Sequence, residues 1–500
     1  MAIPDPRQAA GVTRRSPDVR QYQTHLQLLA CTSVRRDASL DAIIVPAARP
    51  APNLDHAVTL ARALGCWLVV LCSVKARADE VNDLLALRNF KQAIVVDIDD
   101  GYTHPALAFA TSNRDAMGLP WELVSPNGDL STKRNLGLLL ARMLGWERIF
   151  FLDDDIRDLD ASDLRVAGSM LGPYHVVGMR AVDFPDNSVV CHGHRKTGGY
   201  QDVFISGSAL AVHCAGSVAF FPEIYNEDWF FFYHAAAAKR LGQHRRDATQ
   251  LWYDPFADPQ RAAGQEFGDV MAEGLYSLLH HRTGADLATS DYWRSFLKSR
   301  MTFLQAVLDR SEAVEPYLRK RIVASIKMAQ VCARLIQPSA CERYISLWRQ
   351  DLRAWDRTLA ETPRLTSVKA ALDALGLTPS KPNLYVLAGL IDDTGNRYGC
   401  KGALAVGPAG PARLISSYLT PIAAPAAGPF TALNAASADR EGIGPAKGVI
   451  SRIGKRAGEL AVRTRMAREP GRHRKVAPVS YVSSADEAES VYVGQEAFSY

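Results

Sequence analysis

Three consecutive carboxylates, Asp153, Asp154 and Asp155, follow the apolar residues 149–152. Like charges at this spacing repel one another, and each carboxylate loses water beside a packed core. A divalent cation would cancel the repulsion. Clustered oxygen ligands suit Mg²⁺ or Mn²⁺, with coordination positions left for phosphates. We therefore expect Asp153 and Asp155 to hold Mn²⁺ or Mg²⁺; the alternative is a solvated acidic turn.

Lys133, Arg134 and Asn135 stand in the first turn of a helix that leads directly into this acidic strand end. Two cations at a helix start would add positive charge beside a bound phosphate group. Asn135 would orient the neighbouring loop. A helix face exposed to solvent explains the two cations equally well.

A second acidic pair, Glu227 and Asp228, precedes the aromatic residues 229–232. A carboxylate among aromatic rings is partly desolvated, which raises its pKa toward a value useful for accepting a hydroxyl proton. Asp228 is therefore the candidate general base, with Glu227 as its substitute or as a residue that holds the acceptor. The alternative is a capped helix start, with Asn226 or Asp228 accepting backbone N–H bonds.

Strands and helices alternate through the first half of the chain. Apolar runs predict buried strands at 41–45, 67–71, 93–97 and 149–152, and periodicity predicts helices at 54–64 and 132–144. This alternation indicates βαβ units and a mostly parallel sheet flanked by helices. Ligands bind at the carboxyl ends of the strands in such sheets, where residues 153–155 stand.

Composition divides the chain into four parts. We expect a loose leader at 1–38, an α/β catalytic domain at 39–265, a helical region at 266–394, and a weakly ordered basic tail at 395–500. Residues 447–475 are rich in Lys and Arg. They predict either a basic amphipathic helix on an anionic membrane surface or, as the favoured alternative, a solvated tail.

Overall composition excludes several classes of protein. The net charge is only +5 over 500 residues, which gives no sign of nucleic-acid binding. Eight cysteines without paired spacing indicate reduced thiols. The first residues lack a signal peptide, and no stretch predicts a membrane span. A cytoplasmic protein is expected, with the tail as the one segment that would bring it to the inner face of a membrane.

The ordered set of Arg-Asn helix, Asp-x-Asp strand end and later Glu-Asp pair resembles GT-A nucleotide-sugar glycosyltransferases, especially the family-2-like branch, over residues 40–260. The resemblance implies a Rossmann-like fold and a metal-dependent, hexosyltransferase-like enzyme. It would move a sugar from a nucleotide-sugar donor to a hydroxyl of a small molecule, a glycan or a lipid-linked acceptor. It also implies metal ligands Asp153 and Asp155, catalytic residues Asp228 and Glu227, and donor-binding residues Pro46, Arg49, Lys133, Arg134, Asn135 and Asp154.

Two features depart from that family. Residues 71–73 lack the acidic pair that ends the second strand in many members, and the Gln-x-x-Arg-Trp motif of processive synthases is absent. His192 and His194 would share one face of a strand, but neither is assigned as a third metal ligand. Two other functions stay open. A nucleotidyltransferase would show a Gly-rich loop where residues 46–50 have none, and a non-catalytic scaffold would not need Asp153, Asp155 and Asp228.

Overall fold

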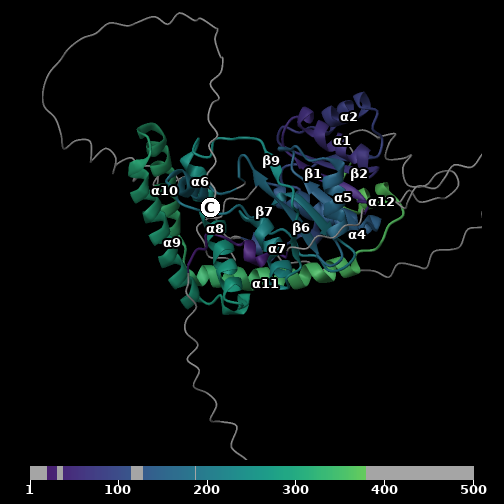
Figure 1. Cartoon of the computed structure of the whole chain (residues 1–500). Coiled ribbons are helices and arrows are strands. Elements are labelled where there is room, and N and C mark those ends of the chain that lie inside the picture. The colour runs from purple at the N-terminus through teal and green to yellow at the C-terminus, as the bar shows by residue number, and fades with distance from the viewer. Residues whose placement is uncertain (1–19, 31–37, 114–127, 186, 379–500) are drawn as a thin grey trace, which may run out of the picture. The chain divides into compact units, whose positions relative to one another are not determined.

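A computed structural model of the chain describes residues 20–30, 38–113, 128–185 and 187–378, all within the unit Met1–Pro411. The described residues form a nine-stranded sheet in the order β3-β2-β1-β4-β7-β6-β9-β5, with β8 beside β6 (Figure 1). The strands are β1 Ala42–Ala47, β2 Trp67–Cys72, β3 Ala93–Asp97, β4 Arg148–Leu152, β5 Ile156–Arg157, β6 Val176–Val182, β7 Ile205–His213, β8 Leu241–Gln243 and β9 Ala248–Gln250.

The first half of the sheet confirms the strands predicted from the apolar runs. β3, β2, β1 and β4 are parallel neighbours. β1 extends to Ala47, so Pro46 lies within the strand and not in the loop expected after Val45. These four strands are buried almost throughout, as near-continuous apolar runs covered on both faces require.

The sheet as a whole is mixed and not purely parallel: five of its described strand pairs are parallel and three are antiparallel. β7 lies between β4 and β6 and is antiparallel to both. The strand–helix alternation predicts parallel crossovers, and it does not anticipate a strand that returns beside β4. This reversal brings the start of β7 next to the acidic turn, where the Asp153 backbone N–H donates to the Ser208 carbonyl at 2.8 Å.

Helices cover both faces of the sheet. Helices α1 (Asp55–Leu64), α2 (Ala78–Leu87) and α5 (Ala161–Met170) share one apolar cluster with the sheet. The opposite face carries α4 (Leu130–Leu144), α7 (Glu227–Ala237), α8 (Pro259–His280), α11 (Pro338–Glu361) and α12 (Val368–Ala374) (Figure 1). A third cluster joins α6 (Val189–Lys196), α9 (Ser290–Arg310) and α10 (Pro316–Leu335). Short 3-10 helices are Leu26–Leu28, Ala51–Leu54, Pro105–Leu107, Ala110–Ser112, Ala285–Leu287 and Ser311–Ala313.

Glycines end the helices α1 and α4. Gly65 follows α1 with φ 65° and Gly145 follows α4 with φ 71°, the left-handed conformation that glycine adopts without a Cβ penalty. Both positions confirm the helix ends expected from the sequence. The tight turn after Gly145 then sends the chain directly into β4, and therefore fixes the distance between α4 and the acidic turn.

Residues 20–30 belong to the range expected to be a loose leader, yet they pack against α8. His25 is 4% exposed, and its Nε2 is 3.2 Å from Glu273 Oε2. Tyr22 stacks on His280 with ring centroids 4.0 Å apart. This segment therefore forms part of the folded domain.

The region expected to be helical at 266–394 contains α9, α10, α11 and α12, while α8 begins earlier, at Pro259. No helix among the described residues is long and apolar enough to cross a membrane. The basic segment 447–475 and the rest of the predicted tail lie outside the described residues, so its contact with a membrane surface stays a prediction.

Candidate active site

Arg134 connects three segments that are far apart in the sequence. Its Nη2 donates to both carboxylate oxygens of Asp153 at 3.0 Å, and its Nη1 donates to Glu227. Arg134 is 2% exposed. A guanidinium group can satisfy two carboxylates at once because its donors form a rigid fork. The start of α4, the end of β4 and the start of α7 therefore meet at one side chain.

Gly207 in β7 allows this close approach. A Cβ at residue 207 would lie 2.8 Å from Arg134 Nη1 and 2.9 Å from the Asp228 Cβ. Both distances are shorter than carbon atoms tolerate, so a larger residue would separate the strand from the two side chains. This close approach therefore explains why residue 207 is a glycine, which the composition of residues 204–212 alone does not.

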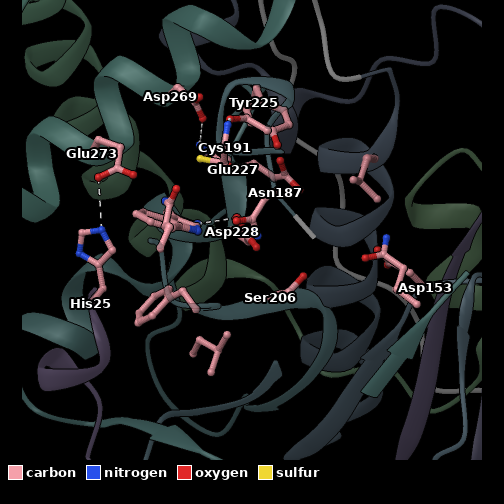
Figure 2. A pocket seen from close by; sticks show the side chains of 18 of the residues that line it. His25, Asp153, Asn187, Cys191, Ser206, Tyr225, Glu227, Asp228, Asp269 and Glu273 are labelled. Carbon is pink, nitrogen blue, oxygen red and sulfur yellow. Dashed lines mark hydrogen bonds and ion pairs between the residues drawn. The ribbon is translucent and has the colours of Figure 1, made fainter. Parts of the chain in front are cut away.

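A pocket opens where these segments meet. Figure 2 shows His25 and Glu273 on one side, Asp153 on the opposite side, and Asp228 and Ser206 between them. Carboxylates dominate its charged lining, namely Asp153, Asp202, Glu227, Asp228, Asp269 and Glu273, against the guanidinium groups of Arg134 and Arg261. This pocket is thus more suited to hydroxyl or cationic groups than to an anion without its own cation.

Asp228 is a half-buried residue at the start of α7. Its Oδ2 accepts the Gly207 backbone N–H and its Oδ1 accepts the Trp229 backbone N–H, both at 2.8 Å. Asn226 adopts the left-handed conformation with φ 63°, and its amide donates to Asp269 instead of capping the helix. The capping alternative therefore holds only in part: Asp228 binds a backbone N–H of its own helix, and Asn226 does not.

Glu227 lies deeper than Asp228. It is 5% exposed and paired with Arg134. Burial raises the pKa of Glu227 above its usual range, while the nearby Arg134 guanidinium opposes that rise. Because it is already bound to a fixed cation, Glu227 is more suited to positioning than to proton transfer.

The other two carboxylates of the acidic turn face a second cation. Asp154 accepts the backbone N–H groups of Ala48 and Arg49 at 2.7 Å and also binds the Arg49 side chain. Asp155 Oδ2 accepts from Arg49 Nη2 at 2.8 Å and from Gln250 Nε2 at 3.2 Å. Arg134 and Arg49 therefore cancel part of the like-charge repulsion among the three aspartates, a role that the sequence alone gives to a metal ion.

Asp153 and Asp155 supply carboxylate oxygens, which are the ligands that Mg²⁺ or Mn²⁺ prefers. Two carboxylates alone leave most coordination positions of the metal ion open. Among residues 20–30, 38–113, 128–185 and 187–378, no group of three or more His, Cys, Asp or Glu side chains could hold a metal ion. Mg²⁺ commonly uses one or two carboxylates together with substrate phosphates. The two aspartates fit such a shared site, and they do not form a closed protein cage.

Three further residues expected at the donor lie away from the Arg134 cluster. Lys133 is 1% exposed and donates to the Ala47 carbonyl at 2.8 Å, and burial lowers its pKa. Asn135 binds the backbone N–H and carbonyl of Phe221 at 2.8 Å each. Pro46 is buried in β1. Lys133 and Asn135 thus fasten the ends of strands and loops around the site.

Sequence reasoning missed the α8 wall of the pocket. Asp269 and Glu273 lie one turn apart, and their spacing of four residues places them on one helix face. The sequence does not predict His25 as a pocket residue, because its segment has the composition of a loose leader. His192 and His194 lie in helix α6 and not on a strand, so they do not share the strand face expected for them.

Comparisons with known proteins give no family. No family model matches the sequence, and no curated protein matches it. Solved structures do match, among them mannosyltransferase PcManGT from Pyrobaculum calidifontis in complex with GDP-Man and Mn²⁺. That match has 12% sequence identity and a TM-score of 0.32, and it covers 70% of this chain and 91% of the other. Values this low do not establish a shared fold.

Proposed function

We propose that the chain is a hexosyltransferase-like glycosyltransferase of the GT-A kind, which moves a sugar from a nucleotide-sugar donor to an acceptor hydroxyl. The observation that carries the proposal is the junction at Arg134, where Asp153 and Glu227 are joined beside Asp228 in one pocket. The three segments of the sequence resemblance are thus the three segments that line the pocket.

Asp228 is the proposed general base. It lines the pocket at a helix start, and two backbone N–H bonds hold its carboxylate in one orientation. A carboxylate so oriented can accept the proton of a bound hydroxyl as that oxygen attacks the sugar. Glu227 positions Arg134 and, through it, Asp153.

The donor is proposed to bind along the carboxyl ends of β1 and β4. Arg49 and Asp154 border this edge, and Arg134 supplies positive charge next to Asp153. Pro46, Lys133 and Asn135 act indirectly, because they hold the strand and loop ends that form the edge. Asp153 and Asp155 would hold Mn²⁺ or Mg²⁺, whose chemistry is to neutralise the departing diphosphate.

A thermal-shift screen of nucleotide sugars, with and without Mn²⁺, tests the proposal. A ligand that binds the native state alone raises the melting temperature, by an amount that depends on its concentration relative to Kd. We expect at least one nucleotide sugar to stabilise the protein when Mn²⁺ is present and to lose most of that effect in EDTA. Stabilisation by nucleoside triphosphates but not by nucleotide sugars would favour a nucleotidyltransferase, and no response to either class would favour a scaffold.

A further inference from the structure

Trp252 is a large aromatic side chain that the fold leaves exposed to solvent. It is 74% exposed, and its neighbour Leu251 is 40% exposed. Of the described tryptophans, Trp67, Trp146, Trp293, Trp348 and Trp355 are all buried. An exposed indole next to an exposed leucine keeps apolar surface in water, and such surface is a candidate for recognition of a ligand.

The segment that carries Trp252 is attached to the acidic turn. β9 pairs with β5, with Gln250 opposite Ile156, and the Leu251 backbone N–H donates to the Asp155 carbonyl at 3.0 Å. Gln250 Nε2 also donates to the Asp155 carboxylate. Trp252 therefore stands two residues beyond a strand whose end is fixed against the proposed donor site.

Gln250 has an acceptor atom that the protein does not use. The residue is 8% exposed and lines the pocket, yet its Oε1 has no hydrogen-bond partner in the described structure. A buried polar atom without a partner costs free energy, and a ligand hydroxyl at this point would satisfy it. Gln250 is thus a second and independent indication of a ligand at this wall.

Further aromatic rings join Trp252 to the pocket wall. Phe184 contacts Trp252 with ring centroids 6.2 Å apart and Tyr253 with centroids 4.5 Å apart. Arg261, which lines the pocket, lies over the Tyr253 ring with its guanidinium carbon 4.2 Å from the centroid. We call Phe184, Trp252 and Tyr253 the aromatic shelf. Its three rings are not part of the pocket lining, and Arg261 connects them to it.

We propose that the aromatic shelf binds the outer sugar ring of an acceptor that is a saccharide of at least two units. This inference rests on the proposed function and names its acceptor class. The inner ring would lie in the pocket, with a hydroxyl on Gln250 Oε1, and the outer ring would stack on Trp252. The C–H face of a pyranose carries partial positive charge, which complements the electron-rich face of an indole ring.

The charge of the pocket favours this occupant. Among the described residues, six carboxylates and two guanidinium groups line it. The carboxylates are those of Asp153, Asp202, Glu227, Asp228, Asp269 and Glu273, and the guanidinium groups are those of Arg134 and Arg261. Carboxylates accept hydrogen bonds from neutral hydroxyl groups and repel phosphate groups. An anionic lipid headgroup therefore matches this wall less well than a neutral polyhydroxyl chain does.

Saccharide binding to the full chain, measured without donor, tests the inference. The probes are glucose, galactose, mannose and N-acetylglucosamine, each with its di- and trisaccharides, observed by saturation-transfer difference NMR. We expect at least one oligosaccharide to bind more tightly than its monosaccharide. Trp252→Ala should weaken that binding by about tenfold and leave the monosaccharide unchanged, while Trp252→Phe should keep most of the affinity.

Tyr317→Ala is the matched control, because Tyr317 is 70% exposed in α10 and is not part of the pocket lining. It should change no affinity. The inference is overturned if no oligosaccharide binds better than its monosaccharide, or if Trp252→Ala leaves the affinities unchanged. It is also overturned if phosphatidylglycerol vesicles, and not saccharides, shift the tryptophan fluorescence of the wild type to the blue and Trp252→Ala abolishes that shift.

The same variants separate this inference from the proposed function. Trp252→Ala should retain the nucleotide-sugar thermal shift of the wild type, because Trp252 belongs to the acceptor wall. A wild type that gives the nucleotide-sugar response but binds no oligosaccharide better than its monosaccharide would refute the acceptor shelf alone. A wild type that binds oligosaccharides but no nucleotide sugar would refute the transferase and leave the shelf standing.

Discussion

Arg134 donates to both carboxylate oxygens of Asp153, each at 3.0 Å, from a position that is 2% exposed. This charge-assisted contact from Nη2 holds the Asp153 carboxylate in place as well as neutralising its charge. The same guanidinium binds Glu227. Any ligand that approaches Asp153 therefore meets a carboxylate already held by a cation that it must share or displace.

Arg134→Met should destabilise the fold. Removing one partner of a buried ion pair leaves uncompensated charge, here on Asp153 and Glu227, at a cost of about 3–5 kcal/mol. Urea unfolding followed by circular dichroism measures the change. Arg294→Met is the control, because Arg294 pairs with Asp291 on the surface and its loss should cost less than about 1 kcal/mol. Equal effects of the two substitutions would contradict a buried role for Arg134.

Gly207→Ala should disturb the site with little change elsewhere. The added methyl group would lie within 3 Å of both Arg134 and Asp228, and overpacking of this kind costs about 1–3 kcal/mol. We expect a lower free energy of unfolding and a loss of transfer activity. Gly216→Ala serves as the control, since a Cβ there meets no atom within 4 Å. If Gly207→Ala behaved like the control, the close approach would not constrain the site.

His192 should make stability depend on pH. Burial lowers the pKa of His192 from 6.5 to about 4, while its ring stacks on Phe184. Because the folded state disfavours the proton, this contribution is complete above pH 6.5 and is lost as the pH falls toward 4. The loss would be up to about 3 kcal/mol. His192→Phe keeps the stacking ring, so its free energy of unfolding should fall less over this range than that of the wild type. Parallel curves for the two proteins would refute the assignment.

Asp155→Ala should abolish metal-dependent nucleotide binding and leave the fold intact. Asp155 would contribute one of two carboxylate ligands, and Mn²⁺ titration followed by calorimetry measures the loss. Asp163→Ala is the control, because Asp163 stands at the start of α5 and does not line the pocket. Full nucleotide-sugar binding by the Asp155 variant in EDTA would make the metal model untenable.

Local patterns predict much of the fold. The strands of the parallel half, the helices α1 and α4 and their terminal glycines follow from apolar runs and periodicity over short stretches. Asp153 and Asp228, which the resemblance to the glycosyltransferases assigns to one site, both line the pocket. These features depend on residues close together in the chain.

The remaining features depend on contacts between distant segments. The antiparallel placement of β7 follows from its pairing with β4 and β6, which the sequence of β7 does not reveal. Arg134 pairs with Asp153 and Glu227, and Arg49 pairs with Asp154 and Asp155. These ion pairs neutralise carboxylates that the sequence alone assigns to solvent or to a metal ion. His25 joins the pocket only because its segment packs against α8, where His25 contacts Glu273 and the Tyr276 ring.

The most direct test of the central claim is nucleoside diphosphate release by the wild type and by Asp228→Asn, each given a stabilising nucleotide sugar and the saccharide acceptor. The account predicts acceptor-dependent release by the wild type. It predicts release slower by about 10²–10⁴-fold in the variant, with donor binding nearly unchanged, since an amide cannot take the proton of the acceptor hydroxyl. Asp202→Asn, at another lining carboxylate, should keep most of the activity. Near-native turnover by Asp228→Asn, or pyrophosphate as the product of the wild type, would contradict the account.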